Sequence, residues 1–125
     1  MAVARRRIDL QEGKAALKVW LEGTQAPSDT PLPRTVLATA VRYSLEELTA
    51  RAPGNSVEVR VPPFGVTQCV EGPRHTRGTP PNVIECDAAT WLAMVTGQLD
   101  WADAVSAGRV AASGLRADLS ALLPF

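Results

Sequence analysis

Residues 56–71, "SVEVRVPPFGVTQCVE", mark the point where the spacing of apolar residues changes from that of a helix to that of a strand. Over residues 57–61 three valines alternate with a glutamate and an arginine, which is typical of a strand with one buried face. The proline- and glycine-containing residues 62–65 predict a turn, and residues 66–71 predict a strand that returns beside the first. The stretch therefore predicts an antiparallel hairpin within a sheet.

Two helices are predicted before this hairpin. Asp9 and Glu12 form a capping pair that opens the first helix, and Gly23 is expected to end it. Apolar residues spaced three and four apart predict a second helix from about residue 33 to residue 52. The chain thus begins with a two-helix segment over about residues 9–52.

After the hairpin, the sequence predicts a third strand at residues 82–86, "NVIEC". If residues 72–81 turn the chain back on itself, the three strands form a meander in which Cys69 lies opposite Cys86. The two Cα atoms would then be ~4.5–5.5 Å apart, and we expect both thiols to be reduced.

Two short helices and a last strand complete the predicted order. Asp87 and Asp100 are expected to cap the helices, and "RVAAS" at residues 109–113 predicts a short fourth strand. We expect "DLSALLPF", residues 118–125, to pack back onto the domain. This order of elements predicts an α+β fold with a mainly antiparallel sheet.

Length and charge limit the possible functions. The 125 residues suit one domain spanning residues 1–125. Thirteen basic and 13 acidic residues give a net charge of zero, which argues against a nucleic acid partner. No apolar run approaches the ~18 residues that span a bilayer, so no stable membrane insertion is expected, and the basic start "MAVARRR" leads into no apolar signal segment. We expect a cytoplasmic protein, whose oligomeric state the sequence leaves unknown.

No familiar catalytic or metal-binding motif occurs in the chain. The single histidine cannot form a two-histidine metal site, and the two cysteines, Cys69 and Cys86, lie in predicted strands where a thiol is usually buried and inert. We therefore expect no catalytic residues, no metal and no cofactor, and no enzyme activity from this chain alone.

Residues 72–81, "GPRHTRGTPP", are a candidate site for an anionic head group. Arginine forks suit carboxylates and phosphates, so Arg74 and Arg77 would bind the anion and His75 would be a secondary donor. A hairpin turn needs about two to five residues, whereas this segment has ten. The alternative is a solvated basic turn stiffened by prolines, and the residue types leave both interpretations open.

The C-terminal third of the chain is rich in large apolar side chains. These either pack a core or line a ligand cavity, and the pattern alone does not separate the two. The candidate lining residues are Trp91, Leu92, Val95, Leu119, Leu122, Leu123 and Phe125.

Residues 87–114, "DAATWLAMVTGQLDWADAVSAGRVAASG", resemble the closing part of sterol carrier proteins, and nearly the whole chain is similar to a compact actinobacterial branch of that family. The resemblance implies a four- to five-stranded, mainly antiparallel sheet covered by helices, with an apolar cavity between sheet and helices for lipids or fatty-acyl chains. The chain departs from the eukaryotic carriers, which have five strands, because it has four predicted strands and two helices before them.

Three functions are consistent with these observations. The first is non-catalytic binding or transfer of a hydrophobic or amphipathic ligand, such as a lipid or fatty acid, in an internal apolar cavity. The second is an accessory domain or small enzyme that orients an anionic substrate through residues 72–81 while a partner supplies catalysis. The third is a structural interaction module with a filled core.

Overall fold

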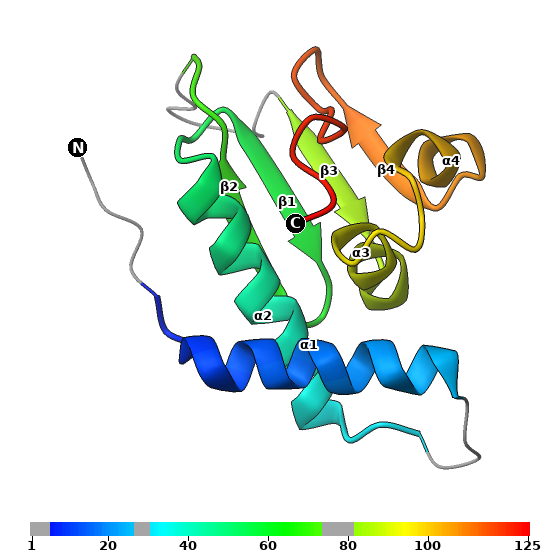
Figure 1. Ribbon diagram of the computed structural model, residues 1–125. Helices are drawn as coiled ribbons and strands as arrows, with labels where there is room; N and C mark the ends of the chain where they lie inside the picture. Colours follow the sequence, from blue (N-terminus) through cyan, green and yellow to red (C-terminus); the bar gives the residue numbers. More distant parts are fainter. Residues whose placement is uncertain (1–5, 27–30, 74–81) are drawn as a thin grey trace.

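The computed structural model describes residues 6–26, 31–73 and 82–125. In these residues helices cover one face of a four-stranded sheet (Figure 1). The predicted α+β class is confirmed. The elements in chain order are α1 (Leu10–Gln25), α2 (Arg34–Arg51), β1 (Val57–Val61), β2 (Gly65–Cys69), β3 (Val83–Cys86), α3 (Ala88–Val95), α4 (Trp101–Ser106) and β4 (Val110–Ser113).

The first helix begins where its cap was predicted. The Asp9 carboxylate accepts hydrogen bonds from the backbone N–H groups of Gln11 and Glu12, both at 3.1 Å. The helix does not end at Gly23, as was predicted, but continues to Gln25. It packs across α2, where Gly13 faces the ring of Tyr43 so closely that a Cβ atom would clash with it.

The sheet has the strand order β2-β1-β3-β4. The predicted hairpin is confirmed, because β1 and β2 pair antiparallel with Val57 opposite Cys69. The predicted meander is wrong: β3 pairs parallel with β1 on its other side, and β4 pairs antiparallel with β3. The sheet is therefore mixed, with four strands and two antiparallel pairings out of three.

The strand order also overturns the predicted cysteine pair. Cys69 lies opposite Val57 on β2, whereas Cys86 lies on β3, separated from β2 by the whole of β1. Two strand spacings of ~4.8 Å separate β2 from β3, so the Cα atoms cannot be ~4.5–5.5 Å apart. Both cysteines are free and buried.

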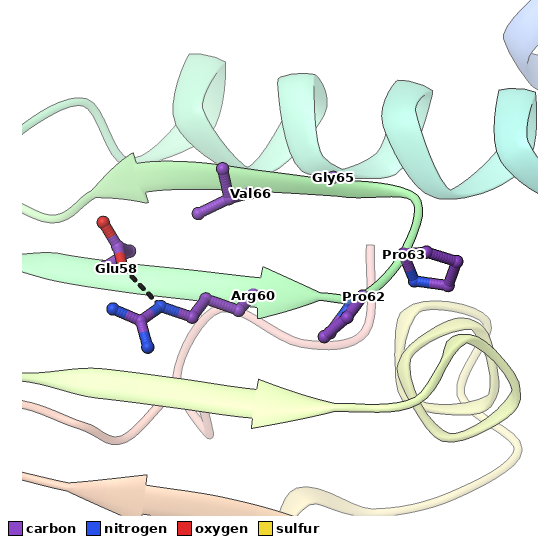
Figure 2. Close-up of a pocket in the computed structure, with 6 residues that line it drawn as sticks. All are labelled: Glu58, Arg60, Pro62, Pro63, Gly65 and Val66. Atoms are coloured by element: carbon purple, nitrogen blue, oxygen red, sulfur yellow. Dashed lines mark hydrogen bonds and ion pairs between the residues drawn. The ribbon is translucent and has the colours of Figure 1, made fainter.

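The two faces of the sheet differ in character. Val57, Val59, Val61 and Ile84 are buried on the face that the helices cover, while Glu58 and Arg60 point to the opposite face, shown in Figure 2. Among the described helices, none is both long and apolar enough to cross a membrane.

Candidate functional site

The seven candidate lining residues belong to one hydrophobic cluster on the covered face of the sheet. Four members come from α3 and the start of the last segment and are almost fully buried. The other three lie near the end of the chain and are partly buried. We call the seven the apolar layer: Trp91, Leu92, Val95, Leu119, Leu122, Leu123 and Phe125.

A buried hydrogen bond fixes the largest side chain of the apolar layer. The indole Nε1–H of Trp91 donates to Oγ of Ser44 at 2.8 Å, and this hydroxyl donates to the carbonyl oxygen of Val41 at 2.8 Å. Ser44 was not among the predicted site residues, although it lies between Val41 and Leu45 on the apolar stripe of α2. A serine on a buried stripe was the signal that could have identified it, because a buried hydroxyl needs partners.

Asp87 orients α3, which carries three of the seven residues. Its carboxylate accepts a hydrogen bond from the backbone N–H of Thr90 at 2.8 Å. Hydrogen bonds from Thr90 hold the pKa of the Asp87 carboxyl below its usual value. The side chain of Thr90 is itself buried and accepts a hydrogen bond from Nε of Arg109 at 3.1 Å.

The C-terminal segment, residues 119–125, carries four of the seven residues of the apolar layer and forms neither a helix nor a strand. The backbone N–H groups of Leu122 and Leu123 donate to the carbonyl of Leu119, and that of Phe125 donates to the carbonyl of Val95 at 3.1 Å. In Figure 1 this segment, drawn in red, lies over the helix-covered face of the sheet. The expectation that it packs back onto the domain is confirmed.

The predicted head-group residues, Arg74, His75 and Arg77, lie outside the described residues, so their role stays a prediction. Asn82, which follows this segment, is held by two hydrogen bonds. The buried amide of Asn82 donates to the carbonyl of Ser56 at 2.7 Å and accepts from the backbone N–H of Arg116 at 2.9 Å.

The strand order accounts for the length of this connection. The chain leaves β2 at Cys69 and re-enters the sheet at Val83, on the far side of β1. A connection that passes the end of a strand needs more residues than a hairpin turn, so its length is not by itself a sign of a binding site.

Neither cysteine has the properties of a catalytic nucleophile. Burial raises the pKa of the Cys69 and Cys86 thiols to about 12, so both are protonated near neutral pH, and only the thiolate is reactive. In the part of the chain that the structure describes, no three His, Cys, Asp or Glu residues gather as a metal site would require.

Two open grooves lie away from the apolar layer. One of about 460 Å³ is on the uncovered face of the sheet (Figure 2), lined by Glu58, Arg60, Pro62, Pro63, Gly65 and Val66. The other, of about 360 Å³, lies between α1 and α2. Neither is lined by a residue of the apolar layer, whose most buried members are inaccessible to solvent.

The family described as bacterial SCP ortholog matches the chain over residues 33–125. The matched region comprises α2, the sheet, α3, α4 and the C-terminal segment, and it leaves α1 outside. No curated protein matches the chain.

Proposed function

The chain belongs to the family of bacterial SCP orthologs, and from this premise we propose that it binds or transfers a hydrophobic or amphipathic ligand, such as a lipid or fatty acid, without catalysing a reaction. One observation carries the proposal. Four residues of the apolar layer lie on a terminal segment that pairs with no strand, and the last three of them, Leu122, Leu123 and Phe125, are only partly buried.

A ligand chain would take the place of those three side chains against Trp91 and Leu119. Full burial of a large apolar side chain contributes about 1.5–3 kcal/mol, and each buried methylene about 0.8 kcal/mol. Displacing three such side chains therefore costs at most roughly 5–9 kcal/mol, which about ten methylenes offset. We expect long acyl chains to bind and chains of about six carbons to bind weakly or not at all.

The head group of such a ligand would be held by Arg74 and Arg77, with His75 as a secondary donor. An arginine fork fits a carboxylate or phosphate by two parallel hydrogen bonds. This part of the proposal rests on the residue types and on the position of their flanking residues, Glu71 and Asn82, beside Arg116.

The test combines native mass spectrometry of protein purified from cells with titration of a fluorescent fatty acid. We expect a co-purified lipid, saturable binding of the probe, and competition that strengthens with acyl-chain length. Arg74→Ala and Arg77→Ala should each weaken binding at least tenfold, since a charge-assisted hydrogen bond contributes about 1.5–3 kcal/mol.

Lys14→Ala is the matched control, because it removes a positive charge from the exposed surface of α1. Equal binding by all three variants would reject the head-group assignment. Absence of both co-purified lipid and probe binding in the unaltered protein would reject the carrier function.

One observation favours a second function, a structural interaction module. Trp91, Leu92 and Leu119 are completely buried among their neighbours, as they would be in a core that is permanently filled. An empty protein that binds no acyl probe would support this alternative. The accessory-domain alternative depends on residues 72–81, most of which lie outside the described residues.

A further inference from the structure

The last turns of α2 hold both ends of the described chain. Nη2 of Arg6 lies 2.7 Å from Oε1 of Glu47, and Nε of Arg51 lies 2.7 Å from Oε2 of the same carboxylate. The guanidinium carbon of Arg51 lies 4.7 Å from the centre of the Phe125 ring. Through Arg51, the carboxylate of Glu47 therefore connects the segment before α1 to Phe125 of the apolar layer.

The segment before α1 is also held through its backbone. The N–H groups of Arg7 and Ile8 donate to the two carboxylate oxygens of Glu46, at 3.0 and 3.1 Å. Residues 6–8 thus contact α2 through two adjacent glutamates, which keeps Arg6 beside Glu47.

The position of Arg51 depends on Glu47. The Arg51 side chain is 49% exposed, and a long exposed side chain loses rotamer entropy when it is held in one place. Stacking on Phe125 requires the flat guanidinium to keep one orientation over the ring. The ion pair with Glu47 provides that orientation. Because the Glu47 side chain is only 16% exposed, water screens this ion pair less than it would screen a fully exposed one.

The surroundings of Glu47 keep its carboxylate charged. Its hydrogen bonds with Arg51 and Arg6 lower the pKa of its carboxyl, against the opposing effect of burial. The neighbouring phenol of Tyr43 stays neutral, because burial and the charge of Glu47 raise its pKa.

We propose that Arg6, Glu47 and Arg51 form a latch that couples residues 6–8 to the C-terminal segment. Releasing Arg6 would therefore loosen the packing of that segment on the domain. Arg6 acts by holding Glu47, which positions Arg51. Residues 6–8 lie outside the region that the family matches, so the family match does not cover the latch. The latch requires no bound ligand, so a test of the latch does not depend on whether the protein is a carrier.

Hydrogen exchange at the Phe125 amide tests the latch, because this N–H donates to Val95 only while the segment is closed. We expect Arg6→Gln and Glu47→Gln each to speed exchange at Phe125 about two- to fivefold, the effect of losing a partly exposed ion pair. Glu58→Gln is the matched control, since it breaks the ion pair between Glu58 and Arg60 on the uncovered face of the sheet. That variant should leave exchange at Phe125 unchanged.

A double variant separates the latch from a general loss of stability. In a Phe125→Leu background, which removes the stacked ring, Glu47→Gln should speed exchange at residue 125 no more than the Glu58→Gln control does. Wild-type exchange at Phe125 in the Arg6→Gln protein would overturn the proposal, even if Glu47→Gln opened the segment. An undiminished effect of Glu47→Gln without the ring would also overturn it.

Discussion

Trp91 and Ser44 form a buried hydrogen bond of 2.8 Å across 47 positions of sequence. Ser44 lies on α2 and Trp91 on α3, and both side chains are inaccessible to solvent. The bond links α2 to α3 and fixes the orientation of the indole ring. It also satisfies the one polar atom of the largest side chain in that layer.

Ser44→Ala should lower the free energy of unfolding by about 1–3 kcal/mol, because it leaves a buried indole N–H without a partner. Chemical denaturation followed by tryptophan fluorescence measures this change. Ser106→Ala, at an exposed position of α4, is the matched control and should change stability little. Equal stabilities for the two variants would show that the hydrogen bond contributes nothing.

Leu119→Ala should destabilise the protein by about 2–5 kcal/mol, the usual range for a fully buried leucine. Leu115→Ala makes the same chemical change four positions earlier, where the side chain is fully exposed. Thermal unfolding of both variants tests whether the C-terminal segment is part of the folded core. A melting temperature unchanged by Leu119→Ala would contradict the packing described above.

Both cysteines should be unreactive in the native protein. A thiol with a pKa of about 12 is almost entirely protonated at pH 8, and burial blocks the approach of a reagent. We expect a disulfide-exchange reagent to react with two thiols per chain in denaturant and only slowly without it. Rapid native reaction of either thiol would conflict with its burial, and a disulfide between Cys69 and Cys86 would conflict with the strand order.

Stability should fall in acid partly through Asp87. The pKa of its carboxyl is lowered in the folded state, so its contribution is present above the unfolded value of ~3.9 and is lost as pH falls through the folded value. Asp87→Asn can still accept the capping hydrogen bond but cannot titrate, so stability should depend less on pH in acid, below about pH 5. Asp100→Asn is the control, because the Asp100 side chain makes no capping bond to α4.

Elements with a strong local signal were predicted well. The strict alternation over residues 57–61 and the turn after it specified the hairpin, because one residue of slip would turn every valine to solvent. The apolar stripe of α2 and the cap at Asp87 likewise depend on near neighbours. The end of α1 was misplaced because Gly23 is tolerated inside a helix when packing on α2 supplies the stability.

The partner of β3 was predicted wrongly for a physical reason. A short apolar strand such as "VIEC" can pair with either neighbour, and its residue types do not indicate which. Placement beside β1 puts the most regularly alternating strand in the middle of the sheet, where Val59 is buried between Thr67 and Ile84. The same placement separates the two cysteines and accounts for the long connection between β2 and β3.

The sequence by itself determined the helices, the hairpin, the α+β class and the set of apolar residues that cluster on one face, because each of these follows from periodicity and caps that involve nearby residues. Only the tertiary structure decided that the sheet is mixed, that Ser44 anchors Trp91, and that Glu47 connects Arg6 to Arg51 beside Phe125. The contact between Arg6 and Glu47 spans 41 positions, that between Ser44 and Trp91 spans 47, and the strand pairings place β2 and β3 on opposite sides of β1. No local pattern encodes such distances, which are set by how the helices and strands pack against one another.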